Sequence, residues 1–119
     1  MDRDATRILL VEDDSVIAYD IKSLLTELGY EVLDVVATGA EAVDAAAALS
    51  PDLVIMDITL EGEMDGIQTA REMQKSGDMP IVYLTAHTDI HTFLAAKKTN
   101  PYGYCMKPAG AHEIYSVVE

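Results

Sequence analysis

The chain has 119 residues, the usual size of a single domain with one hydrophobic core. Its net charge of −13 would repel a nucleic-acid backbone or an anionic membrane, so we expect direct binding to neither. The single cysteine, Cys105, excludes an intrachain disulfide and a cysteine-based metal site, and we find neither a signal peptide nor an apolar run of membrane-spanning length. We therefore expect a cytoplasmic protein.

Five short apolar runs are predicted to form β-strands. They are continuous rather than alternating, which is typical of strands covered on both faces by helices. The runs are Ile8–Val11, Val32–Val36, Leu53–Met56, Ile81–Leu84 and Tyr104–Met106.

Each run is followed by a segment that is predicted to be helical. In the first, apolar residues recur at helical spacing from Ile17 to Leu28 and end at Gly29, a residue type that readily terminates helices. The second, Gly39–Leu49, is rich in alanine and therefore has a high helix propensity. The others are Gly66–Ser76, Asp89–Lys98 and Ala111–Glu119. The last is barely two turns long, so we expect a longer parent protein.

The alternation of strands and helices predicts a doubly wound α/β fold with a five-stranded parallel sheet. Parallel neighbours require a crossover connection, and helices usually supply it. In such sheets, ligands bind beyond the carboxyl ends of the strands. The residues at those ends are therefore the candidates for function.

Polar residues follow four of the five predicted strands: Glu12, Asp13 and Asp14 after the first, Asp57 after the third, Thr85 after the fourth and Lys107 after the fifth. Each alone has an ordinary explanation; Asp14, for example, could cap the first helix. The fold, however, would bring carboxylates, a hydroxyl and an ammonium group into one cleft. Carboxylates this close repel one another, so a compensating cation is expected.

An all-oxygen cluster favours a hard cation, and we expect Mg2+. Zinc is disfavoured because it prefers nitrogen and sulfur ligands, and the histidines show no metal-binding spacing. These histidines are His87, His91 and His112. With a cation bound, ionised Asp57 could attack phosphorus and form an aspartyl phosphate, stabilised by Lys107 and the Thr85 hydroxyl.

Five segments in order resemble the receiver domain of two-component response regulators. They are Ile8–Asp14, Leu53–Asp57, Met64–Gly66, Leu84–Ala86 and Tyr104–Pro108. The resemblance covers essentially the whole chain and implies one receiver domain over residues 1–119. It also implies the flavodoxin-like (βα)5 fold with strand order 2-1-3-4-5.

The resemblance assigns a role to each site residue. Asp57 would be the phosphoacceptor, Asp13 a direct Mg2+ ligand, and Glu12 a ligand acting through water. Thr59 would contribute its backbone carbonyl to the metal, and Asp14 would lie one place beyond the acidic pair as a helix cap.

Three further residues are implicated in phosphate binding and switching by the same resemblance. Lys107 would bind the phosphoryl group, with a cis peptide bond to Pro108. Thr85 and Tyr104 would form the switch pair, in which Tyr104 moves from an exposed to a buried position.

The implied function is a phosphorylation-activated signalling switch rather than an enzyme, since the domain would catalyse only its own phosphorylation and dephosphorylation. The phosphodonor would be a histidine kinase or a phosphotransfer protein. The face formed by the fourth helix, fifth strand and fifth helix would bind an output domain, a partner protein or a second copy of the chain.

Three alternatives make different predictions from the same residues. A phosphatase of the haloacid-dehalogenase type needs an aspartate two residues after its nucleophile, where this chain has Thr59. A flavin-binding module needs a phosphate loop after the first strand, where Glu12 and Asp13 would repel phosphate. A degenerate receiver serving only as a protein-binding scaffold would not take up a phosphoryl group.

Overall fold

A computed structural model of the chain describes residues 6–60, 62–75, 77–85, 90–106 and 111–118. Within these ranges, five parallel strands form one sheet in the order β2-β1-β3-β4-β5, as the sequence predicted. The strands are β1 (Arg7–Val11), β2 (Glu31–Val36), β3 (Leu53–Asp57), β4 (Ile81–Thr85) and β5 (Gly103–Met106). The helices are α1 (Ser15–Glu27), α2 (Gly39–Leu49), α3 (Gly66–Gln74), α4 (Ile90–Lys97) and α5 (Ala111–Val118).

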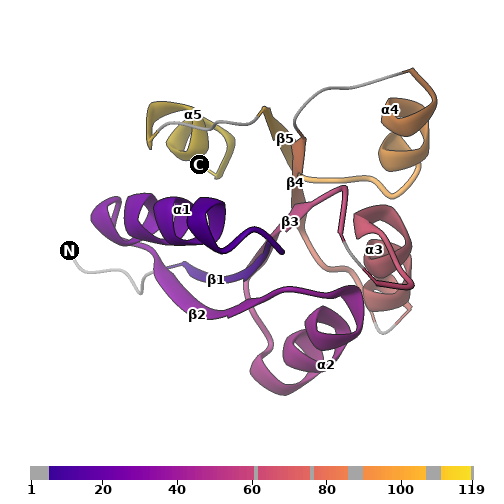
Figure 1. Cartoon of the computed structure of the whole chain (residues 1–119), viewed down its shortest axis with the longest axis horizontal. Coiled ribbons are helices and arrows are strands. Elements are labelled where there is room, and N and C mark those ends of the chain that lie inside the picture. The colour runs from indigo at the N-terminus through magenta and orange to yellow at the C-terminus, as the bar shows by residue number, and fades with distance from the viewer. Residues whose placement is uncertain (1–5, 61, 76, 86–89, 107–110, 119) are drawn as a thin grey trace.

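Helices cover both faces of the sheet. Helices α1 and α5 lie on one face, and α2, α3 and α4 lie on the other (Figure 1). Each face has its own buried apolar cluster, because successive residues of a strand point to opposite sides. In β4, for example, Tyr83 packs with the α3 and α4 side, whereas Leu84 packs with the α1 and α5 side. The doubly wound α/β prediction is therefore confirmed.

Strand β2 differs from the expectation of strands buried on both faces. It lies at the edge of the sheet, where Glu31 and Asp34 are exposed and its other residues are half-buried. Its pairing with β1 is also irregular, because Ile8 pairs with Val32 while Leu9 pairs with Asp34. An edge strand has only one neighbour, and exposed charges protect its open side from unwanted pairing.

Side-chain caps fix where the first three helices begin. Asp14 Oδ1 accepts hydrogen bonds from the backbone N–H groups of Val16 and Ile17, at 3.0 and 3.2 Å. The predicted cap role of Asp14 is therefore confirmed. Thr38 caps α2 and Asp65 caps α3, each in a reciprocal capping box. All three caps lie on the side of the sheet where the strands end.

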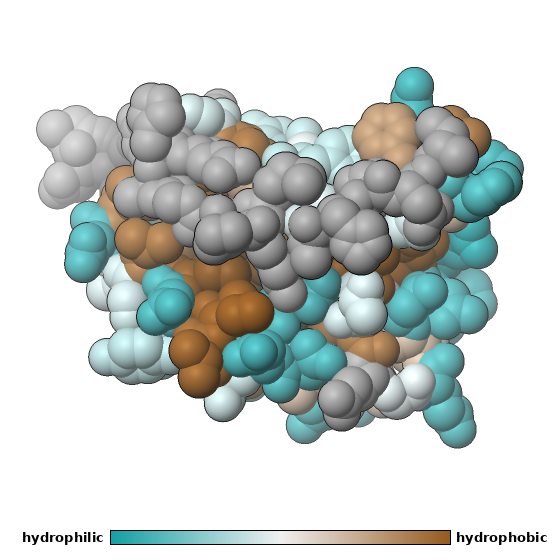
Figure 2. Space-filling view, turned by 45° about the horizontal axis from the view of Figure 1, so that its top comes forward, coloured by the Kyte–Doolittle hydropathy of each residue, from teal (hydrophilic) through white to brown (hydrophobic). Residues whose placement is uncertain are grey.

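Hydrophilic and apolar residues are interspersed on the face shown in Figure 2. The large apolar side chains that stay exposed include Val16 and Tyr19 on α1 and Phe93 and Leu94 on α4. Among the helices of the described ranges, none combines the length and the apolar content needed to cross a membrane.

Gly66, the first residue of α3, packs directly against the end of β3. Its N–H donates to the Ile58 carbonyl at 2.7 Å. A Cβ at this position would overlap the Asp57 carbonyl oxygen and lie 2.8 Å from Ile58 Cα. The contacting atoms belong to the backbone, so neither side can yield without moving the strand end.

We predict that Gly66→Ala lowers the free energy of unfolding by about 1–3 kcal/mol, the usual cost of overpacking. Urea unfolding would measure this loss, and amide NMR would show shifts at Asp57 and Ile58. Gly29→Ala is the control: Gly29 has φ +94° and open space around its Cβ position, so its cost is local strain. A Gly66→Ala variant as stable as the wild type would contradict the close approach.

Candidate functional site

Three carboxylates converge at the carboxyl ends of β1 and β3. One oxygen from each of Glu12, Asp13 and Asp57 can be chosen so that all three lie within 4.8 Å of one another. Glu12 and Asp57 are buried, with 2 % and 5 % of their surface exposed, and Asp13 is half-buried. Carboxylates at such distances repel strongly in a partly buried site.

The parallel pairing of β1 with β3 places these residues. Val11 pairs with Met56, so the residues that follow in each strand emerge side by side. The backbone N–H of Glu12 donates to the Val36 carbonyl at 2.9 Å, which continues the β1–β2 ladder past the end of the strand. The acidic pair is thus held by the sheet itself.

Backbone groups orient two of the three carboxylates. Glu12 Oε2 accepts a hydrogen bond from the Asp14 N–H at 3.1 Å, and Asp57 Oδ1 accepts one from the Thr59 N–H at 3.0 Å. Asp14 itself is exposed and points its carboxylate at the start of α1. The cluster therefore contains Asp13 and leaves out Asp14, in the register that the resemblance implied.

The donor set fits a hard divalent cation. All three candidate side-chain ligands offer oxygen, as Mg2+ prefers, and a partly exposed site leaves room for the waters that this ion retains. Thr59 is exposed beside Asp57 in the loop that follows β3. Its backbone carbonyl remains the predicted fourth protein ligand.

Thr85 is buried at the end of β4, with 6 % of its surface exposed. Strand β4 pairs with β3 so that Asp57 lies opposite Leu84, and the Ile58 N–H donates to the Leu84 carbonyl at 3.0 Å. The strand ends that carry Asp57 and Thr85 are thus adjacent. Lys107 and its bond to Pro108 lie outside the described residues, so both predictions about them stand as made.

Tyr104 lies on the same face of the sheet as Tyr83, because the two residues are paired across β4 and β5. Its ring centroid lies 6.1 Å from that of Tyr83 and 5.4 Å from that of Phe93 on α4. Tyr104 as a whole is half-buried, and burial raises its pKa above that of a free tyrosine. The pKa of Tyr83 is also raised by burial, although its hydrogen bond to Thr99 acts in the opposite direction.

Sequence reasoning missed Tyr83, Thr99 and Phe93. Tyr83 sits inside an apolar strand and looks like an ordinary core residue, while Thr99 looks like a residue at a helix end. Only the register of β4 with β5 and the packing of α4 bring Tyr83 and Phe93 beside Tyr104 and Thr99 beside Tyr83.

The chain resembles several known signalling proteins along most of its length. It is 35 % identical over 113 residues to the transcriptional regulatory protein PdtaR of Mycobacterium tuberculosis, covering 95 % of this chain and 55 % of PdtaR. It is 30 % identical over 115 residues to the phyllosphere-induced regulator PhyR of Methylorubrum extorquens, covering 96 % of this chain and 42 % of PhyR. The chain thus spans about half the length of these curated relatives.

A solved structure shows the same fold. The signal receiver domain of a modulated diguanylate cyclase from Desulfovibrio desulfuricans has a TM-score of 0.91 and 38 % sequence identity, over 97 % of this chain and 91 % of that one. The family model of the response regulator receiver domain matches residues 8–119, a span that includes the acidic cluster and, apart from Arg7 at the start of β1, all five strands. The chain therefore belongs to the response regulator receiver domain family.

Proposed function

We propose that this domain is a phosphorylation-operated switch in which Asp57 accepts the phosphoryl group. The observation that carries the proposal is the convergence of Glu12, Asp13 and Asp57, whose oxygens can lie within 4.8 Å of one another. Such a cluster suits phosphoryl transfer, which depends mainly on positioning and on neutralising charge. Membership of the receiver family supports it.

Asp13 and Asp57 would hold Mg2+ directly, Glu12 through water, and Thr59 through its backbone carbonyl. When bound, the ion supplies positive charge that offsets the carboxylates and the phosphoryl oxygens. The chain's own contribution is to orient the Asp57 side chain. The Thr59 N–H does so by donating a hydrogen bond to Oδ1 at 3.0 Å.

In the transfer step, a carboxylate oxygen of Asp57 forms a bond to phosphorus. The bond between phosphorus and the donor breaks, and the donor group leaves with the electron pair. Lys107 would pair with one phosphoryl oxygen, and the Thr85 hydroxyl would donate to another. Hydrolysis of the acyl phosphate would return the domain to its resting state. The domain would therefore catalyse only its own phosphorylation and dephosphorylation.

We propose a histidine kinase or a phosphotransfer protein as the donor, and the cytoplasm as the compartment. The signal would leave through the face formed by α4, β5 and α5, where Phe93 and Leu94 remain exposed. Exposed apolar side chains of this kind suit an output domain, a partner protein or a second receiver. The half-length match to the curated relatives supports an attached output segment.

Thr85 would transmit the change. When its hydroxyl moves toward the phosphoryl group, space opens behind it, and Tyr104 on the neighbouring strand can move further inward. The outer and the inner position of the Tyr104 side chain would both be populated without phosphate, and phosphorylation would shift the ratio of the two populations. Tyr104 is already half-buried, so the movement is smaller than the exposed-to-buried change expected from the sequence.

We predict that acetyl phosphate with Mg2+ adds one phosphoryl group, and that Asp57→Asn abolishes the addition because it removes the nucleophile. Intact-mass spectrometry would measure both. A domain that acts only as a scaffold would show no adduct, and an adduct that survives Asp57→Asn would place the acceptor elsewhere.

We predict that Asp13→Asn weakens Mg2+ binding roughly tenfold or more, because ligand charge sets the affinity of oxygen-ligand sites. Asp14→Asn is the matched control: Asn caps helices as well as Asp, and Asp14 points away from the cluster. Titration of Mg2+ followed by amide NMR would compare them. Equal losses in both variants would show that the register of the acidic pair is wrong.

We predict that Thr85→Ala leaves phosphorylation of Asp57 largely intact but uncouples the movement of Tyr104 from it, because the alanine methyl group cannot donate a hydrogen bond to the phosphoryl oxygen. The measurement is the amide shift change from Phe93 to Tyr104 on adding beryllofluoride. Thr69→Ala, which removes another buried hydroxyl, is the control and should respond like the wild type. An equal response in the Thr85 and Thr69 variants would overturn this route.

A further inference from the structure

Tyr83 and Phe93 contact the Tyr104 ring from two different elements, β4 and α4. The two ring pairs are tilted by 33° and 32°, with centroids 6.1 and 5.4 Å apart. Among the described residues, the buried Tyr104 hydroxyl has no hydrogen-bond partner. Ring contacts are weakly directional, so Tyr104 can shift between its neighbours without breaking a polar bond.

Tyr83, by contrast, is fixed at its hydroxyl. Its side chain is fully buried, and its hydroxyl oxygen lies 2.7 Å from Thr99 Oγ1. The single Thr99 hydroxyl proton is donated to the Ala96 carbonyl, also at 2.7 Å, so Tyr83 must be the donor to Thr99. Breaking this bond would leave the buried Tyr83 hydroxyl without its acceptor, which is costly.

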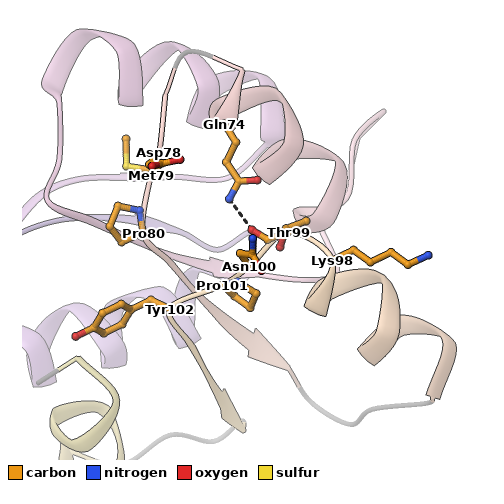
Figure 3. A pocket seen from close by; sticks show the side chains of 9 residues that line it. All are labelled: Gln74, Asp78, Met79, Pro80, Lys98, Thr99, Asn100, Pro101 and Tyr102. Atoms are coloured by element: carbon orange, nitrogen blue, oxygen red, sulfur yellow. Dashed lines mark hydrogen bonds between the residues drawn. The ribbon is translucent and has the colours of Figure 1, made fainter.

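Thr99 is tied to a third element as well. It lies just after α4, and the Gln74 side chain at the end of α3 donates to its backbone carbonyl at 2.8 Å (Figure 3). Gln74 and Thr99 border a pocket of about 590 Å³ beside the carboxyl ends of α3 and α4. The pocket lies at the amino ends of β4 and β5, whereas Asp57 lies at the carboxyl end of β3. The carboxyl end of α4 is therefore bonded to both β4 and α3.

The middle of α4 is held differently. Phe93 and Leu94 are 36 % and 47 % exposed, and Phe93 reaches the sheet through the Tyr104 ring. One helix thus has directional hydrogen bonds just beyond its carboxyl end and a ring contact to the switch residue in its middle. If Tyr104 moves, the fixed end resists and the middle can follow.

We propose that Tyr83 and Thr99 form the pivot of α4, about which the helix turns when Tyr104 changes position. This inference rests on the proposed switching function and adds the residues that direct its motion. Tyr83 is a positioning residue, because it acts through Tyr104 and Thr99. Without the pivot, the same Tyr104 movement would shift the whole helix, and the exposed face would change in a less defined way.

The test removes the bond from either side with Tyr83→Phe and Thr99→Val, and measures amide shifts on adding beryllofluoride with Mg2+. In the wild type, we expect the α4 response to centre on Phe93 and Leu94 and to be small at Thr99 and Asn100. In both variants, the response should spread to Thr99 and Asn100. Without beryllofluoride, their amide hydrogens should exchange about five- to tenfold faster, as expected for the loss of one hydrogen bond.

Two controls separate the pivot from a general loss of packing. Thr99→Ser keeps the hydroxyl and should restore the wild-type pattern. Tyr30→Phe removes the hydroxyl of a buried tyrosine in the other core cluster and should leave α4 unchanged. The Tyr83→Phe, Thr99→Val double variant should match Thr99→Val, which already lacks both the Tyr83–Thr99 bond and the Thr99–Ala96 bond.

The outcomes also separate this inference from the proposed function. If the wild type shows no beryllofluoride response at Asp57 and Thr59, the switch itself is refuted. If that response is present in every variant while Tyr83→Phe and Thr99→Val keep the wild-type α4 pattern, the pivot alone is refuted. A pattern altered equally by Tyr30→Phe would also refute the pivot, because it would reflect core packing in general.

Discussion

The parallel pairing of β1 with β3 brings together carboxylates that repel one another. Val11 pairs with Met56. This pairing places the residues that follow, Glu12, Asp13 and Asp57, at the same end of the sheet. The surrounding backbone is built to hold this arrangement. Backbone N–H groups bind Glu12 and Asp57, and Gly66 lets α3 start against the Asp57 carbonyl. The folded chain thus keeps negative charge concentrated at one point, a donor set that suits a cation.

A second constraint operates on the α4 side of the sheet, where polar and aromatic contacts are separated along one helix. The hydrogen bonds of Thr99 fix the position of the chain just beyond the carboxyl end of α4, whereas the rings of Phe93 and Tyr104 meet in its middle. Hydrogen bonds resist displacement because they are directional, and ring contacts tolerate it. A helix held in this way has a preferred direction of motion, which is what a switch needs in order to give its partners a defined surface.

Receiver domains share a fold that also serves unrelated functions, so the fold alone would not distinguish a switch from a flavin-binding module. The distinction comes from the strand ends. Where a nucleotide-binding relative needs backbone amides to attract phosphate after β1, this chain has Glu12 and Asp13, which repel phosphate unless a cation intervenes. Thr59, in place of a second aspartate, likewise removes the general acid that a phosphatase of the haloacid-dehalogenase type would need.

Local sequence patterns determined the elements of this protein, and tertiary packing decided how their side chains meet. Apolar runs, helical spacing and Gly29 predicted each strand and helix to within about two residues, and the strand-end position of Asp57 marked the site. The exposure of β2 could not be predicted, because a strand's place in the sheet depends on pairing between distant segments. The roles of Tyr83 and Thr99 were hidden for the same reason. Their residue types suit a core strand and a helix end, and only the packing of α4 on β4 joins their hydroxyls.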